Sequence, residues 1–467
     1  MTTSLFARDK KSALSPAADR ILHSPLFILF LVCACAVPYA FSAYAAGFWL
    51  CCAALSLALV LTRSILPSFA AFLFCTVSVI EQYKITYEEI FGYAGVLALV
   101  IPALVFHIFY YAKGRRGYTL TRMFFPQLAV SVALLLGGAG TITAAEYFSL
   151  PSIYYMLFLG IVLLAIMVFC DCDMPFNFDF VGRYLARTLM GIALLFCIMW
   201  IIAFVHDGTG QFPYRQWKNN AGNFMLIAMP LTVWRGSKSR FGVPYVLFAL
   251  VQVSTVILSG SRGATLAIAV TLILSAAVYV YGIKDKKARL AAEGALALAL
   301  LITLAAIFLS DGASRLISLF ESMDIFDGNG REELYFLGVQ NALDYPLFGV
   351  GIGYINEEAW QLNDMAIFWY HSTPVQVAAS MGAAGGAAYL YQFIARIRLG
   401  LRRNTYCLSV LISFLGFAAY SCINTGDFTP LPFGVLMVVL FLSLERNLDL
   451  PASKLFSGRR MDFVRGK

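Results

Sequence analysis

The sequence contains few charged residues: Asp, Glu, Lys and Arg make up 13% of its 467 residues, whereas hydrophobic residues make up 60%. A soluble domain typically carries about 25% charged residues, so this chain has too few polar side chains to cover a water-exposed surface. The mean hydropathy of +0.77 points the same way. Together these values exclude a disordered protein, a secreted disulfide scaffold and a cytosolic enzyme.

The cysteines lack the spacing of a metal site. None of the ten cysteines forms a CxxC pair or a cluster with histidine, so a zinc site is not predicted. Nearly all of them lie within apolar runs, where cysteine behaves as a small hydrophobic residue. The first 25 residues are polar and basic, and no small-residue cleavage site follows a short apolar core, so no cleaved secretory signal is predicted either.

Long apolar runs recur instead, from Leu26 to Leu444. A bilayer-spanning helix needs about 20 apolar residues, so these runs predict an all-α polytopic integral membrane protein with about 12–14 transmembrane helices. The expected spans are residues 26–43, 46–62, 65–80, 91–112, 123–140, 154–170, 188–205, 220–234, 241–259, 263–281, 290–309, 373–393, 406–423 and 430–444.

The distribution of basic residues predicts the orientation. With the N-terminus in the cytoplasm, 28 of the 34 Lys and Arg residues fall on cytoplasmic segments. This asymmetry is a strong positive-inside signal and places both termini in the cytoplasm. It also explains the net charge of +8 without nucleic-acid binding. The outer face keeps six basic residues: Lys84, Arg215, Lys218, Arg262, Arg315 and Arg331.

Segment 311–372 is the one long outer loop, and loops of this length are usually functional. It separates residues 1–310, with the first eleven spans, from residues 373–467, with three spans and a basic tail. A helix is expected over 331–344, with Asn329 as N-cap and Pro346 just beyond its end. The glycine-rich "FGVGIGY" that follows is not a nucleotide-binding fingerprint, because no strand-turn-helix unit surrounds it. We expect a mostly helical lid on the outer face.

His371 closes this loop at the outer end of the expected span 373–393. It is the only side chain there with an unperturbed pKa near neutrality, which suits a general base. The alternative is an interfacial histidine that hydrogen-bonds to backbone.

Arg262 lies in "LSGSRGATLA", where two apolar spans meet almost without a loop. An arginine at that depth needs an anionic partner, and its guanidinium suits bidentate binding of phosphate oxygens. The alternative is a structural arginine paired with Glu146 or Asp427.

Arg215 and Lys218 alternate with Tyr214 and Trp217 in "FPYRQWKNN". Such a group could bind a phosphate beside a sugar ring; for Lys218, an aromatic belt beside solvated charge is the favoured interpretation. Three asparagines at the start of the following span indicate that this helix end faces a wet cavity: Asn219, Asn220 and Asn223. Arg331 is a further candidate ligand, or a partner of neighbouring glutamates.

In this order, these segments resemble the O-antigen ligase and O-antigen polymerase superfamily of polytopic membrane glycosyltransferases. The resemblance covers roughly residues 210–395 and comprises the arginine-containing loop, "LSGSRGA", "GREELYFLGVQNALDYPLFGVGIGYI" and "HSTPVQVAASMGAAGG". The chain has His371–Ser372 where the family more commonly has His–Asn. Residues 1–200 match only as a helix-rich scaffold.

The resemblance implies a fold of the GT-C type in a bacterial inner membrane, with chemistry at the periplasmic face and no metal or cofactor. The donor would be a glycan on undecaprenyl diphosphate. His371 would be the general base, Arg215 and Arg262 would hold the diphosphate, and Arg331 would be a third contact.

Three functions remain open. The first is an O-antigen ligase that transfers the glycan to lipid A-core. The second is a polymerase that joins lipid-linked repeat units, and the third is a lipid-linked glycan transporter. The histidine favours the ligase, because many polymerases of the family rely on arginines. The chain shows no internal inverted repeat, which disfavours the transporter.

Overall fold

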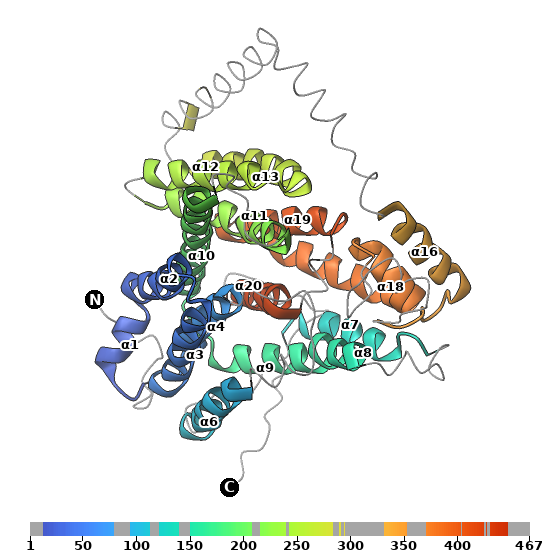
Figure 1. Ribbon diagram of the computed structural model, residues 1–467, viewed down its shortest axis with the longest axis horizontal. Helices are drawn as coiled ribbons and strands as arrows, with labels where there is room; N and C mark the ends of the chain where they lie inside the picture. The colour runs from blue at the N-terminus through green and yellow to red at the C-terminus, as the bar shows by residue number, and fades with distance from the viewer. Residues whose placement is uncertain are drawn as a thin grey trace.

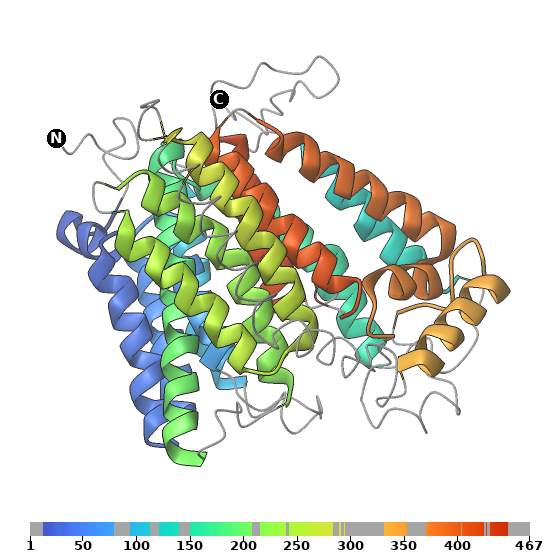
Figure 2. The ribbon, with the colours of Figure 1, turned by 90° about the horizontal axis from the view of Figure 1, so that it is seen from above.

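The computed structural model describes residues 13–78, 94–112, 121–139, 150–207, 215–239, 242–283, 289–290, 294, 331–352, 370–402, 404–424, 426 and 430–446. Across these residues the protein is all-α, and the only β-type pairing described is an isolated bridge between Ala13 and Thr62. This confirms the predicted all-α polytopic membrane fold. Figures 1 and 2 show the helices from two perpendicular directions.

The described elements follow one another along the chain with short connections. They are α1 (Pro16–Leu22), α2 (Pro25–Ala40), α3 (Tyr44–Leu61), α4 (Ile65–Ser78), α6 (Ala94–Tyr110), α7 (Phe124–Leu136), α8 (Leu150–Tyr155), η3 (Met156–Val162), α9 (Leu163–Asp173), α10 (Phe178–Asp207), α11 (Arg215–Ser237), α12 (Val243–Leu258), α13 (Arg262–Tyr281), α16 (Arg331–Asp344), α18 (Thr373–Gly400), α19 (Thr405–Ser421), η5 (Pro430–Gly434) and α20 (Val435–Glu445).

A helix stands in every range where a span is expected, except that residues 290–309 lie mostly outside the described residues. By length and composition, three helices of the described part can each cross a membrane: Met156–Asp173, Phe178–His206 and Gly263–Tyr281. The pair α1 and α2, bent by 62°, is a fourth candidate, and seven further apolar helices have 10–17 residues. The expected outer helix over 331–344 is confirmed as α16; its expected cap Asn329 lies outside the described residues.

Burial separates inner from lipid-facing helices. Residues 221–234 of α11 are all buried, as expected for a helix that is apolar on every face. By contrast, α12 and α13 expose large apolar side chains, among them Leu258 at 56% and Ile273 at 64%. In a polytopic membrane protein such surfaces face lipid tails.

Glycines let three helices approach closely. A Cβ on Gly222 of α11 would lie 2.6 Å from Cβ of Ala264 on α13, and one on Gly263 would lie 3.0 Å from Cε2 of Tyr420 on α19. Helix interfaces in membranes are rich in small residues because packing, rather than hydrophobic exclusion, holds helices together there. The starts of α11 and α13 and the end of α19 therefore meet at one end of the bundle, here called the His371 end.

The opposite end, here called the Asp171 end, contains buried charged groups. Asp171 Oδ1 lies 2.6 Å from Arg446 Nη2. Asp173 Oδ2 lies 3.3 Å from His107 Nε2, and Asp173 Oδ1 lies 3.9 Å from Arg63 Nε. Buried charges are tolerated when they are paired and hydrogen-bonded. These contacts connect α4, α6, α9 and α20, and they give His107 a structural role.

The long helix α18 is broken, which the sequence analysis did not predict. Gly382 has a φ of 57°, so the helix changes direction within its length (Figure 2). Segment 346–352, which follows α16, supplies the hydrogen bonds that the helix loses. The N–H groups of Val350 and Gly351 donate to the carbonyls of Ala379 and Ser380, at 2.8 and 3.0 Å. In the other direction, the N–H groups of residues 383 and 384 donate to the carbonyls of residues 346 and 347.

The glycines of "FGVGIGY" thus serve backbone docking. Gly349 and Gly351 have φ values of 65° and 93°, which residues with a Cβ rarely adopt. The docked segment also accepts a hydrogen bond at the Phe348 carbonyl from the N–H of Gly138, just after α7, at 2.8 Å. It therefore ties α16, α7 and both halves of α18 together.

Candidate active site

His371 lies directly before α18 and is half-buried. Its φ of 50° is left-handed, an uncommon conformation for a residue other than glycine that occurs mainly where surrounding structure enforces it, often at functional sites. Ser372 follows as the N-cap of α18. The structure thus confirms that a histidine opens this helix.

Hydrogen bonds from α16 and α18 hold the backbone around His371. The hydroxyl of Tyr335 donates to the His371 carbonyl at 3.4 Å. The N–H of Tyr370 donates to Gln376 Oε1 at 3.1 Å, and Asn341 Nδ2 donates to the Tyr370 hydroxyl at 2.7 Å. A Cβ on Gly338 would lie 2.8 Å from Cδ1 of Tyr370, so α16 packs closely on the start of α18. The histidine is therefore fixed from both helices.

Arg331, the first residue of α16, lies on the same side of α16 as Tyr335, one turn away. Its Nη1 donates to the Ile423 carbonyl at 3.4 Å, just beyond the end of α19. Burial, with a smaller contribution from the positive charge of Arg331, lowers the pKa of His371 from 6.5 to about 4. The imidazole is therefore neutral at pH 7 and available to accept a proton.

A triangle of polar groups lies where α11, α13 and α19 meet. The hydroxyl of Tyr420 donates to Asn219 Oδ1 at 3.0 Å, and the hydroxyl of Ser261 donates to the same oxygen at 3.3 Å. The two hydroxyls are 3.1 Å apart. Tyr420 and Ser261 are both buried at 3% exposure. This confirms that the asparagine-rich start of α11 faces polar surroundings.

The helices place the predicted arginines at one end of the bundle. Arg215 begins α11 and Arg262 begins α13, and these helices contact one another and α19. Arg331 is brought to the same end by its bond to Ile423. Several predicted contacts lie outside the described residues: Tyr214 as a whole, and the side chains of Arg215, Trp217, Lys218 and Arg262.

Tyr335 and Tyr420 were missed by sequence reasoning. Tyr335 lies in "REELYFLGVQ", and its position one turn after Arg331 is the signal that could have indicated it. Tyr420 is typical of an aromatic residue at a span end, and its contacts arise only from tertiary packing.

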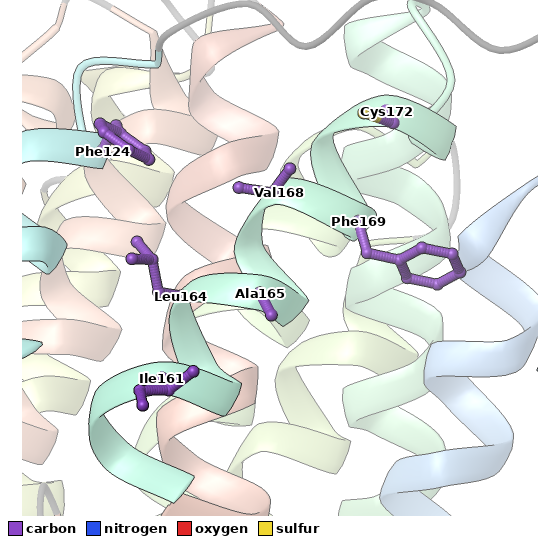
Figure 3. Close-up of a pocket in the computed structure, with 7 residues that line it drawn as sticks. All are labelled: Phe124, Ile161, Leu164, Ala165, Val168, Phe169 and Cys172. Carbon is purple, nitrogen blue, oxygen red and sulfur yellow. The ribbon is translucent and has the colours of Figure 1, made fainter. Parts of the chain in front are cut away.

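The largest cavity in the described part of the chain lies elsewhere. It has a volume of about 490 Å³ and opens along α9 and the start of α7 (Figure 3). Its wall has carbon and sulfur side chains only: Phe124, Ile161, Leu164, Ala165, Val168, Phe169 and Cys172. Cys172 adjoins Asp171, so the cavity reaches toward the Asp171 end. Its chemistry suits a hydrocarbon chain rather than the charged part of a substrate.

Comparison with known families adds to this geometry. Residues 246–390 match the family model described as O-antigen ligase. The chain carries an O-antigen ligase domain. This match confirms the resemblance, and members of the family are glycosyltransferase-like enzymes. No curated protein gives a significant match.

The O-antigen ligase domain contains α12, α13, α16 and the first part of α18. It therefore includes Arg262, Arg331 and His371, whereas Arg215 and the C-terminal end of α19 lie outside it. Within the described residues, no group of three or more His, Cys, Asp or Glu side chains could hold a metal ion.

Proposed function

We propose that the protein is an O-antigen ligase, which transfers a glycan from undecaprenyl diphosphate to lipid A-core at the periplasmic face of the inner membrane. The observation that carries the proposal is the neutral, half-buried imidazole of His371 beside Arg331, at the end of the bundle where α11 and α13 begin with arginine. The match to the O-antigen ligase family supports the same reaction class.

In the proposed reaction an acceptor hydroxyl oxygen attacks the anomeric carbon of the donor sugar. The bond from that carbon to the diphosphate oxygen breaks, and the hydroxyl proton passes to His371. Attack from the side opposite the leaving group inverts the anomeric configuration. Negative charge develops on the departing diphosphate, and Arg215, Arg262 and Arg331 stabilise it as fixed cations, without a metal ion.

The proposed orientation follows from charge. The described basic residues near helix ends gather at the Asp171 end, among them Arg63, Arg235 and Arg446, whereas Arg215, Arg262 and Arg331 lie at the other. The positive-inside rule then places the Asp171 end and both termini in the cytoplasm. The His371 end faces the periplasm, where a lipid-linked glycan and lipid A-core would both reach it.

A deletion strain complemented with the gene distinguishes the three candidate functions. Loss of a ligase leaves polymer on the undecaprenyl carrier and bare lipid A-core, and this is the expected result. Lipid A-core capped by a single repeat unit would identify a polymerase. Lipid-linked repeat units trapped on the cytoplasmic side would identify a transporter. Gel profiles of lipopolysaccharide and analysis of the lipid-linked pool report all three outcomes.

The depressed pKa of His371 predicts an unusual pH dependence. Because the free enzyme keeps His371 neutral down to about pH 4, the acid limb of kcat/KM should lie near pH 4 rather than near 6.5. Arg331→Gln removes a positive neighbour, so the limb should move upward. Burial, the larger cause, remains, and the shift should therefore stop short of 6.5. Bound diphosphate raises the pKa of His371, which places the limb of kcat at higher pH than that of kcat/KM.

The same shift predicts the direction of acid sensitivity. Between about pH 4 and 6.5 the unfolded chain binds a proton at His371 that the folded protein does not, so stability falls as pH decreases through this window. An acid limb of kcat/KM that stays in place in Arg331→Gln would contradict the assigned proximity of the two side chains.

A further inference from the structure

The C-terminal end of α19 contacts elements that carry all three arginines of the proposed site. Tyr420 bonds to Asn219 on α11 and lies 3.1 Å from the hydroxyl of Ser261, just before α13. Three residues further on, the carbonyl of Ile423 accepts from Arg331 of α16. One short stretch of chain therefore connects the beginnings of three helices.

Each partner of Tyr420 is close in sequence to an arginine. Asn219 follows Arg215 by four residues, so both lie on one face of α11, one turn apart. Ser261 directly precedes Arg262, the first residue of α13. The position of the triangle therefore determines where the backbones of Arg215 and Arg262 lie relative to one another.

Ser261 gives up an ordinary role to join the triangle. It occupies the N-cap position of α13, where serine usually accepts a hydrogen bond from the first turn of its helix. No such side-chain bond is made here. Its hydroxyl instead donates across to Asn219. A residue suited to stabilising its own helix is thus used to join two helices.

Close packing fixes the ring of Tyr420. A Cβ on Gly263 would lie 3.0 Å from Tyr420 Cε2, and one on Gly222 would lie 4.0 Å from Tyr420 Cε1. The ring therefore lies against both helices at the height of the triangle, with glycine backbone on either side. Loss of its hydroxyl leaves the ring in place and removes only the polar connection.

We propose that Tyr420, with Asn219 and Ser261, is a positioning residue that sets the spacing between Arg215 and Arg262 so that both bind one diphosphate. The inference rests on the proposed function, because it takes a lipid diphosphate as the ligand. Tyr420 itself does not contact the reacting atoms. Its contribution is selectivity for two linked phosphates over one.

The test compares Tyr420→Phe with Tyr406→Phe in the purified full-length protein. Tyr406 is a matched control because it is also buried on α19, at 1% exposure, and its hydroxyl lies 2.8 Å from Ser443 Oγ near the other end of the helix. Binding of undecaprenyl diphosphate and of undecaprenyl monophosphate is measured for each variant, together with thermal unfolding.

Tyr420→Phe is expected to weaken diphosphate binding by roughly 3- to 10-fold, the scale of one hydrogen bond, with little change in monophosphate binding. Ser261→Ala should act in the same direction, whereas Tyr406→Phe should keep the wild-type ratio of the two affinities. An unchanged ratio in both Tyr420→Phe and Ser261→Ala would overturn the positioning role. A wild-type protein that binds both lipids equally would instead overturn the proposed donor, and this inference with it.

Discussion

Replacement of His371 by alanine is expected to lower the rate of glycan transfer by roughly 10²- to 10⁴-fold, the usual contribution of a general base. The imidazole is the group that would take the proton of the acceptor hydroxyl, and it is neutral at pH 7 because burial and Arg331 depress its pKa. Transfer is measured with purified protein, a lipid-linked donor and lipid A-core, with a chelator present throughout.

The backbone of His371 requires a second variant. Its φ of 50° disfavours alanine, whereas asparagine tolerates this conformation. His371→Asn should therefore be as inactive as His371→Ala while keeping wild-type abundance and thermal stability. His206→Ala serves as the control, because His206 is exposed at the end of α10. Wild-type transfer by His371→Asn would eliminate the general-base role.

Gly382→Ala is expected to cause the largest loss of stability of any single methyl addition considered for α18. The left-handed φ of 57° costs roughly 1–2 kcal/mol for an L-residue. In addition, the new Cβ would lie 2.6 Å from the Leu347 carbonyl carbon and 2.7 Å from the Phe348 nitrogen, both of them backbone atoms. Segment 346–352 would have to leave the break, so α16 and His371 should be displaced together.

Gly386→Ala, four residues further along the same helix, is the matched control. Its Cβ would meet no atom within 4 Å, and alanine in a helix interior is favoured over glycine by roughly 0.5–1 kcal/mol. Thermal unfolding in detergent should therefore show opposite signs for the two variants. Equal effects would mean that the break in α18 does not depend on the docked segment.

The transmembrane helices could be predicted because each is coded locally, by an apolar run bounded by charge, proline or glycine. The bounds of α16 could be predicted for the same reason, since its sequence carries its own start and stop signals. The break in α18 could not. "SMGAAGGAAYL" reads as a continuous helix of small residues, and the hydrogen bonds that stabilise the break come from residues about thirty positions away.

The candidate site divides in the same way. His371 and the arginines were predictable because ionisable groups are rare in apolar sequence and therefore conspicuous. Tyr335 and Tyr420 were not, because a tyrosine at a helix end is ordinary and only packing reveals its partners. The positions of Asn219 and Tyr420 outside residues 246–390 show that the matched domain does not hold the site by itself.

The docking of segment 346–352 on α18 has a consequence for biogenesis. A helix that enters the bilayer alone must satisfy its own backbone polar groups, yet α18 at its break relies on N–H and carbonyl groups that belong to the preceding loop. The break can therefore form only after the chain on both sides of residues 353–369 is in place. The left-handed turn at Gly382, and with it the geometry around His371, is completed late in membrane insertion, as a product of assembly rather than of the helix itself.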